Sequence, residues 1–181
     1  MGAITYEVKV DWAGNNWTDT PTFGTDIDDI SDYTKTVSYE RGKDKELGNS
    51  PAATLELRLN NEDGRFSPPN ASGPLYSYLI PWKIIRVRAY HNAVWYNEFF
   101  GFINRYMIEP HWDVKEAYIY ATDGMDVLAR QIITQDNDIK TSLREDEAIA
   151  RILDAAGWAS SRRSLDADGQ TLTEYPECSV F

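Results

Sequence analysis

The side chains best suited to chemistry are the carboxylates and amides of one stretch near the N-terminus, DWAGNNWTDTPTFGTDIDDISD, at residues 11–32. A hard cation such as Ca²⁺ requires oxygen ligands at alternating positions. The stretch supplies such oxygens at Asp11, Asn15, Asp19, Asp26, Asp28 and Asp29. Their spacing departs from the EF-hand pattern, in which D-x-[DN]-x-[DN]-G precedes a distant Glu. We therefore favour a solvated loop that joins two strands. A Ca²⁺ site formed by Asp11, Asn15 and Asp19 is the alternative.

Other residues that could support catalysis are few. His91 and His111 stand in unrelated contexts, and the sequence contains no His-x-x-x-His pair, G-x-S-x-G, Walker-type loop or G-x-G-x-x-G. The single cysteine, Cys178, excludes an internal disulfide and a thiolate zinc site. The 29 acidic residues could supply a carboxylate pair for glycoside hydrolysis, but no pair stands out. We expect a protein that is not an enzyme and has no cofactor.

Composition excludes further classes of function. The net charge of −11 argues against a nucleic-acid partner, because phosphate binding relies on clustered Lys and Arg. No apolar run approaches the roughly 20 residues that span a bilayer, so we expect no membrane insertion. The N-terminus, MGAITYEVKV, lacks the basic and apolar regions of a signal peptide. We therefore expect the protein to be made in the cytoplasm.

The elements that would position these side chains are mostly strands. Apolar and polar residues alternate over 4–12 and again over 55–59, the period of a half-buried strand. Further runs rich in β-branched and aromatic residues lie at 36–41, 84–90, 94–103 and 117–122. The sequence therefore predicts a mainly β fold, an antiparallel β-barrel or sandwich, with two short helices late in the chain.

Both expected helices follow the last of these strands. The first opens at Thr122 or Asp123 and carries Met125, Val127, Leu128 and Ile132. The second has a capping box of Ser142 and Glu145 and apolar residues at Ile149, Ile152, Leu153 and Ala156. Gly157 is expected to end it.

The order of these elements predicts two domains. A β-barrel domain covers 1–133, a polar hinge lies near 134–141, and a small α/β domain begins at 142 and continues to 181. Because residues 170–181 resemble a strand just being entered, we expect the chain to be the N-terminal portion of a longer protein.

A second unusual stretch, LNNEDGRFSPPN at residues 59–70, is best explained by shape. Asp63-Gly64 is a strong turn dipeptide, because glycine tolerates positive φ and Asp bonds its own local backbone. Phe66 is expected to fold back onto the apolar face, and Pro68 prevents further ladder hydrogen bonds. Arg65, beside Asp63, is expected to form an orienting ion pair. The stretch thus predicts a structural corner.

The sequence also resembles a known family. ISDYTKTVSYERGK, followed by ATLELRLNNEDGRFSPPNASGPLY, is similar to the N-terminal region of minor tail proteins of tailed phages, of the tail-tip or baseplate hub type. IIRVRAY, FFGFINRY, AYIYATDGMDVLAR, EAIARILDAAGW and RRSLDADGQTLTEY continue the similarity in the same order. It covers nearly the whole chain, and its most specific part is NNEDGRFSPPN followed by PLY.

The resemblance implies a virion structural protein at the distal end of the tail. Such hub proteins use a β-barrel domain to build a ring around the tail axis, which implies a homo-oligomer, expected as a trimer, with distal tail and tape measure proteins as neighbours. The alternative is a carbohydrate-binding or peptidoglycan-degrading module that acts on the host envelope through exposed Trp residues. A calcium-dependent adhesion domain is a third possibility.

Overall fold

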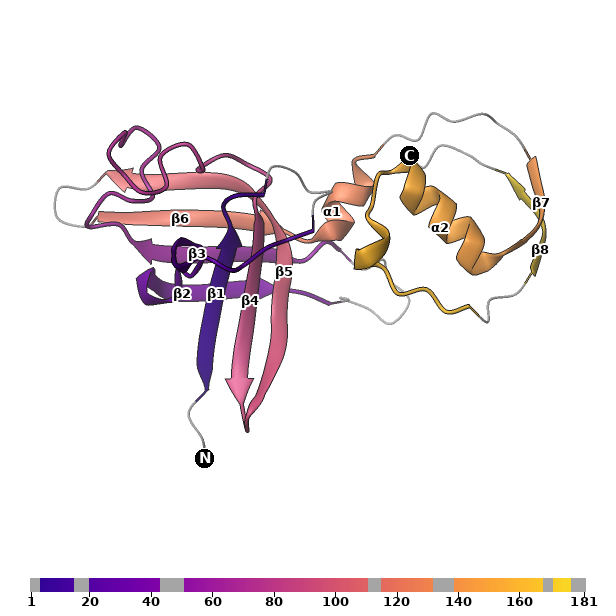
Figure 1. Ribbon diagram of the computed structural model, residues 1–181, viewed down its shortest axis with the longest axis horizontal. Coiled ribbons are helices and arrows are strands. Elements are labelled where there is room, and N and C mark those ends of the chain that lie inside the picture. The colour runs from indigo at the N-terminus through magenta and orange to yellow at the C-terminus, as the bar shows by residue number, and fades with distance from the viewer. Residues whose placement is uncertain are drawn as a thin grey trace. The chain divides into compact units, whose positions relative to one another are not determined.

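The computed structural model describes residues 4–14, 20–42, 51–110, 115–131, 139–167 and 171–176. These residues form two compact units, which divide between Asp126 and Val127 (Figure 1). The first unit contains a six-stranded sheet, and the second contains a helix and a two-stranded sheet. No helix in the described part of the chain has the length and apolar character needed to span a bilayer.

Six strands form one antiparallel sheet in the order β1-β4-β5-β6-β3-β2. The strands are β1 (Thr5–Asp11), β2 (Thr34–Glu40), β3 (Thr54–Asn60), β4 (Ile84–His91), β5 (Val94–Pro110) and β6 (Lys115–Thr122). The sheet curls into a half-barrel, so β1 and β2 are its two edges (Figure 1). The prediction of a mainly β, antiparallel fold with two short late helices is confirmed.

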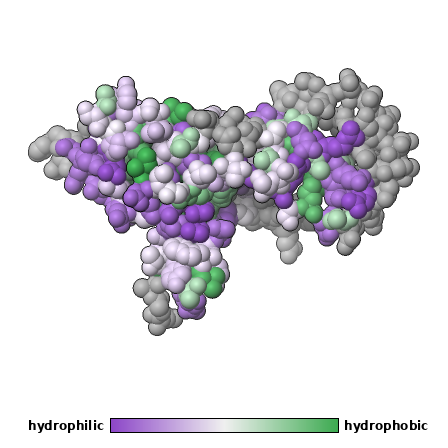
Figure 2. Space-filling model, viewed as in Figure 1, coloured by the Kyte–Doolittle hydropathy of each residue, from purple (hydrophilic) through white to green (hydrophobic). Residues whose placement is uncertain are grey.

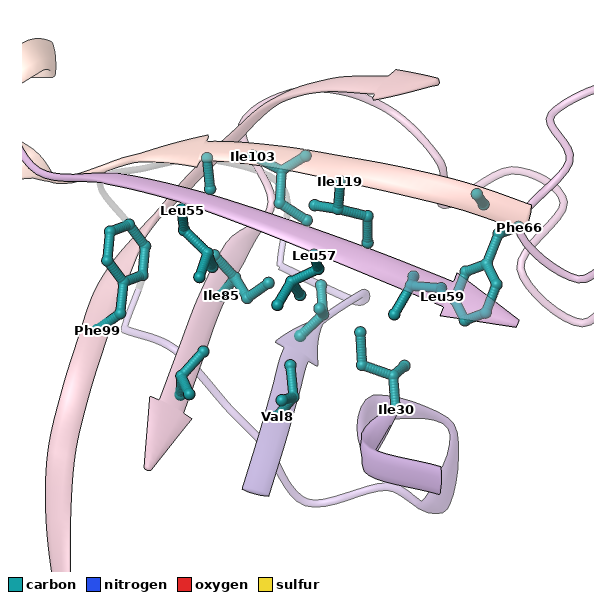
Figure 3. Packing of buried hydrophobic residues seen from close by; sticks show 14 of the residues in the cluster. Val8, Ile30, Leu55, Leu57, Leu59, Phe66, Ile85, Phe99, Ile103 and Ile119 are labelled. Carbon is teal, nitrogen blue, oxygen red and sulfur yellow. The ribbon is translucent and has the colours of Figure 1, made fainter. Parts of the chain in front are cut away.

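The core lies on the inner face of the half-barrel, where the predicted alternation places apolar side chains (Figure 3). Leu55, Leu57 and Leu59 of β3 are almost fully buried, whereas Glu56 and Arg58 between them are exposed. Burial of each leucine contributes about 2 kcal/mol of transfer free energy. The apolar pattern therefore fixes which face of each strand points inward.

One strand is longer than predicted. β5 was expected to end at Ile103, but it continues to Pro110 by pairing with β4 in its first half and with β6 in its second. A bulge between Ile103 and Arg105 shifts the alternation by one residue, which conceals the continuation in the sequence. Gly101 lies just before this bend, where a Cβ atom would come within 2.2 Å of the Thr122 carbonyl oxygen.

The late helices are α1 (Gly124–Ala129) and α2 (Glu145–Ala155), and α1 crosses the division between the units. Asp123 caps α1 as predicted, since its carboxylate accepts a hydrogen bond of 3.0 Å from the Met125 N–H. Gly157 ends α2 as predicted, with φ +73°. The N–H groups of Gly157 and Trp158 donate to the carbonyl groups of Asp154 and Leu153, which is a Schellman motif.

The predicted start of α2 is wrong. Ser142 lies inside β7 (Ile139–Arg144), which pairs with β8 (Thr171–Pro176), so it does not cap a helix. β7 also includes residues 139–141, which form the end of the hinge predicted at 134–141. Helix α2 instead begins after Arg144, whose backbone N–H donates to the Glu147 carboxylate at 3.1 Å. Pairing with a strand about 30 residues later in the chain is a non-local effect that the local capping pattern does not contain.

Candidate functional site

The feature most suited to contact with other molecules is the hairpin of β4 and β5. Its two strands extend away from the rest of the half-barrel together with the start of β1 (Figure 1). Asn92 and Ala93 form the two-residue connection, with φ +49° and +62°. Positive φ at both positions is the signature of a type I′ turn, whose twist matches that of the strands. The turn therefore fixes the pairing at the end of the hairpin, where His91 lies opposite Val94.

Large apolar side chains are exposed at its end. We call the group formed by Ile4, Tyr6, Tyr90, Val94, Trp95 and Tyr96 the hairpin surface. Each of these side chains is between 36% and 55% exposed, and Figure 2 shows hydrophobic residues at the end of the projection. The segment AYHNAVWYN, residues 89–97, contains no Asp, Glu, Lys or Arg, although these make up 26% of the chain. A local excess of aromatic residues with few charges is typical of the core of a protein interface.

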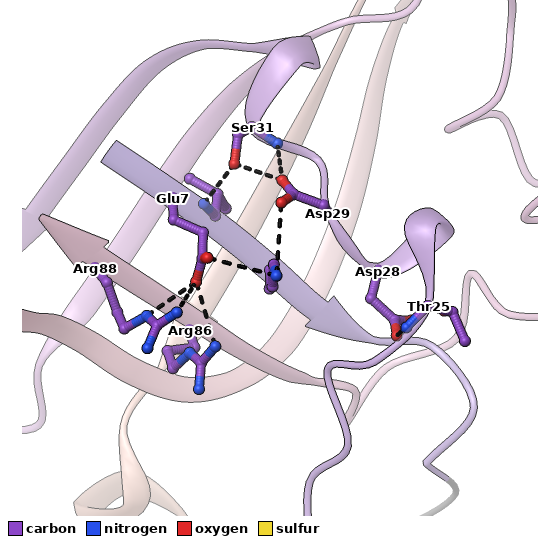
Figure 4. A network of polar contacts seen from close by, with 9 residues as sticks. Glu7, Thr25, Asp28, Asp29, Ser31, Arg86 and Arg88 are labelled. Carbon is purple, nitrogen blue, oxygen red and sulfur yellow. Dashed lines mark hydrogen bonds and ion pairs between the residues drawn. The ribbon is translucent and has the colours of Figure 1, made fainter. Parts of the chain in front are cut away.

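Charged residues at the base of the hairpin join its strand β4 to the neighbouring strand β1 (Figure 4). Glu7 of β1 accepts hydrogen bonds from Arg88 at 2.6 Å and from Arg86 at 3.3 Å, both in β4. Burial disfavours the charged form of Glu7, but these guanidinium groups lower the pKa of its carboxyl below the usual value. Arg88 also lies 4.7 Å from the ring centre of Trp95, whose ring is 4.9 Å from that of Tyr90. Tyr90 and Trp95 are therefore held in place by contacts within the chain.

The two edges of the sheet face each other across a cavity of about 390 Å³. Tyr6 and Val8 of β1 line one side, and Val37 and Tyr39 of β2 line the other. The Tyr39 hydroxyl crosses to β5 and donates to the Glu98 carboxylate at 2.7 Å, a hydrogen bond that raises the pKa of Tyr39. β2 and β5 are not neighbours in the sheet. This bond therefore holds the curl of the half-barrel at its open side.

The predicted corner residues lie in a closely bonded turn. Gly64 has φ +70°, and the Asp63 carboxylate accepts from the backbone and the side chain of Arg65, the latter at 2.8 Å. Burial disfavours ionisation of Asp63, but its bonds to Arg65 lower the pKa of the carboxyl. The Asn70 side chain, two residues after Pro68, closes the turn by donating to the Gly64 carbonyl at 3.0 Å. These contacts are local, within about ten residues of chain.

Phe66 connects this turn to the core, with 1% of its surface exposed. Its N–H donates to the Asn61 side-chain oxygen at 2.9 Å, and its ring meets Tyr33 edge-on at 5.9 Å. The Arg65 guanidinium lies 3.8 Å from the centre of the same Tyr33 ring. Tyr33 ends the short 3₁₀ helix η2 (Ser31–Tyr33), so the corner packs on the segment that leads into β2.

Of the three residues proposed for Ca²⁺, Asn15 and Asp19 lie outside the described residues. Asp11 is 1% exposed, and its carboxylate accepts from the N–H groups of Gly14 at 2.9 Å and Thr22 at 3.0 Å. The described residues contain no group of three or more His, Cys, Asp or Glu side chains arranged to hold a metal.

Later acidic residues of this stretch bond to their own backbone. Asp28, in the 3₁₀ helix η1 (Asp26–Asp28), accepts from the Thr25 N–H at 2.8 Å. Asp29 accepts from the N–H and the hydroxyl of Ser31 and forms an ion pair with Lys9 at 3.7 Å (Figure 4). These carboxylates therefore contribute to the shape of the loop.

A second cluster of charges surrounds Glu116 of β6, which is 2% exposed. Arg58 donates to its carboxylate at 2.7 Å and Lys35 at 3.1 Å. The Arg58 hydrogen bond, helped by Lys35 and opposed by burial, lowers the pKa of Glu116 to about 2. The cluster joins β2, β3 and β6, and its acid is already neutralised by two cations. It is therefore suited to holding strands rather than to proton transfer.

The sequence did not single out the hairpin surface, the Tyr39–Glu98 bond or the Glu116 cluster. The nine-residue run without charges around the turn was a usable signal for the hairpin. The other two join residues 59 and 58 positions apart, so no local spacing indicates them.

Comparisons with known proteins leave the family open. No protein-family model matches the sequence, and no curated protein matches it. Among solved structures, the chain is similar to the 43 kDa tail protein of prophage MuSo2 from Shewanella oneidensis, with a TM-score of 0.49 and 12% sequence identity. The match covers 96% of this chain and 43% of that tail protein. A similarity of this degree does not establish the function of the chain.

Proposed function

We propose that this protein is a structural component of a bacteriophage tail tip or hub, whose copies make symmetric contacts at the distal end of the tail. The sequence segments around NNEDGRFSPPN first suggest this role by their resemblance to minor tail proteins. The observation that supports subunit contact most directly is the hairpin surface, an uncharged aromatic group on a projecting ribbon.

Physical reasons favour this surface as the contact. A chain with a net charge of −11 repels copies of itself wherever acidic surfaces meet, so an uncharged patch is the best place for association. Tyr and Trp contribute large contact areas at a small cost in side-chain entropy. The type I′ turn and the Glu7 ion pairs fix the patch before binding, which reduces the cost of ordering. The expected assembly is a trimer, with distal tail and tape measure proteins as neighbours.

The location in the particle is tested by labelling intact phage particles with an antibody raised against the purified chain, followed by electron microscopy. The proposal expects label at the distal end of the tail. Label on the head, or particles that contain no trace of the chain by mass spectrometry, would contradict it.

The exposed aromatic side chains also support the alternative function, a carbohydrate-binding or peptidoglycan-degrading module. Trp95 and Tyr96 present ring area to solvent, and sugars stack on such rings. Calorimetric titration with soluble peptidoglycan fragments tests this alternative. Binding that is lost in Trp95→Ser but kept in Trp158→Ser, a tryptophan of the second unit, would favour it over the structural role.

A further inference from the structure

A buried lysine lies beside the stretch that the sequence suggested for Ca²⁺. Lys83 precedes β4 and is 3% exposed. Its ammonium group donates to the carbonyl oxygens of Trp12 at 2.7 Å and Gly14 at 2.6 Å. A buried charge is costly unless several partners compensate it. These two carbonyl groups are therefore part of a site that is built around a positive charge.

Asp11 provides the opposite charge for this site. It is 1% exposed, and its attraction opposes the lowering of the Lys83 pKa that burial causes. The chain turns tightly here, because the Asp11 carboxylate accepts from the Gly14 N–H. A Cβ atom at Gly14 would lie 2.6 Å from an Asp11 carboxylate oxygen, so a larger residue there would displace the carboxylate that closes this turn.

The two carbonyl oxygen atoms that contact the ammonium are of a kind that hard cations bind. Backbone carbonyl groups are usual ligands of Ca²⁺, and an ammonium has three donors to direct at such oxygens. We propose that the ammonium of Lys83 is the built-in cation of the turn from Asp11 to Gly14, in the place that a metal ion would take, and that this turn folds without a metal.

The lysine also joins the turn to the sheet. The Lys83 carbonyl accepts from the Ile103 N–H at 2.8 Å, and the Trp82 N–H donates to the Ile103 carbonyl at 2.7 Å. On the other side, Trp12 is fully buried, and its indole N–H donates to the Ile27 carbonyl at 2.9 Å. Loss of the ammonium is therefore expected to loosen both ends of the segment between Trp12 and Ile27.

The test compares unfolding temperatures of the full chain and its variants, with EDTA and with CaCl₂. The wild type is expected to unfold at the same temperature in both. Lys83→Met keeps the length of the side chain and removes its charge, and we expect a fall in Tm of about 5 °C or more. Lys115→Met, at an exposed lysine of β6, is the matched control, and its Tm should differ little from that of the wild type.

A second variant tests the site by rescue. In Lys83→Ala, methylammonium or Ca²⁺ should recover part of the lost Tm, because the oxygen-lined site is then empty.

A measurement on the unmodified chain decides the matter if the Lys83 variants do not fold. Brief acetylation followed by mass spectrometry should modify Lys115 much faster than Lys83. The proposal is overturned if Lys83 reacts as fast as Lys115, or if EDTA lowers the Tm of the wild type and Ca²⁺ restores it. It is also overturned if Lys83→Met is as stable as Lys115→Met, or if Lys83→Ala is destabilised and no cation recovers it.

Discussion

Phe66 illustrates how a single side chain can fasten a turn to the core. We expect Phe66→Ala to lower the free energy of unfolding by about 3–5 kcal/mol, because the ring is buried and its removal leaves a cavity. Urea denaturation measures the change. Phe66→Leu keeps most of the volume and should cost less than about 1.5 kcal/mol. An unchanged midpoint in Phe66→Ala would show that the corner is not structural.

Glu116 links the stability of the sheet to pH. Its pKa is about 2 in the folded chain and 4.5 in its ordinary state, mainly because Arg58 bonds to the ionised form. A lowered pKa means that the stabilisation is complete above about pH 4.5 and is lost as the pH falls towards about 2. The Tm difference between the wild type and Glu116→Gln should therefore be largest near neutral pH and shrink over this range.

Glu56→Gln is the control for Glu116, since it removes one exposed negative charge from the same part of the sheet. A difference between the wild type and Glu116→Gln that stays constant down to the lowest pH would contradict the assignment of this stabilisation to the ionised carboxylate.

At the scale of residues, the sequence predicts local chemistry better than distant chemistry. The Asp63-Gly64 dipeptide indicated its turn because the contacts that form the turn are themselves local. Lys83 was not singled out, because its partners at Trp12 and Gly14 are 71 and 69 positions away. Burial of a charged side chain depends on such distant partners, and the side chain's type gives no sign of them.

The hairpin is the element on which the proposed contact depends, and its turn offers a direct test of its rigidity. Ala93 has φ +62°, a conformation that costs an alanine about 1 kcal/mol and a glycine very little. We expect Ala93→Gly to slow the hydrogen exchange of the hairpin amides. It should raise the free energy of unfolding by about 0.5 kcal/mol, because the greater entropy that glycine gives the unfolded chain offsets part of the relieved strain.

Ala89→Gly is the matched control for this prediction. Ala89 lies in β4 opposite Tyr96, is buried, and has no positive φ, so glycine there should speed hydrogen exchange. Faster exchange in Ala93→Gly would contradict the type I′ assignment.

At the scale of elements, the alternation of apolar and polar residues predicted the position of the first-unit strands. The prediction failed where a bulge or a distant partner strand determines the structure. The bulge near Asn104 hid the second half of β5, and the pairing with β8 turned an apparent helix cap at Ser142 into part of a strand. Both errors have the same origin, since a strand is defined by its neighbour as much as by its own residues.

At the scale of the whole molecule, the chain forms two units, and the first is a half-barrel whose two edges face a cavity and whose hairpin projects from the sheet. The fold class follows from the sequence pattern, because alternation and turn residues favour an antiparallel sheet. The candidate contact surface does not follow from that pattern, since apolar strand residues look the same whether they face a core or a partner. Only the structure distinguishes the buried Val87 from the exposed Val94.

The central claim, that copies of the chain associate through the hairpin surface, is tested most directly by native mass. Light scattering over a concentration series, with and without EDTA, should be applied to the wild type and to Trp95→Ser combined with Tyr96→Ser. A matched control is Tyr76→Ser combined with Tyr78→Ser, which removes two exposed aromatic side chains elsewhere. We expect a trimer or larger ring in the wild type and the control, insensitive to EDTA, and a monomer in the hairpin variant. A wild type that stays monomeric at every concentration, or a hairpin variant that still assembles, would contradict the claim.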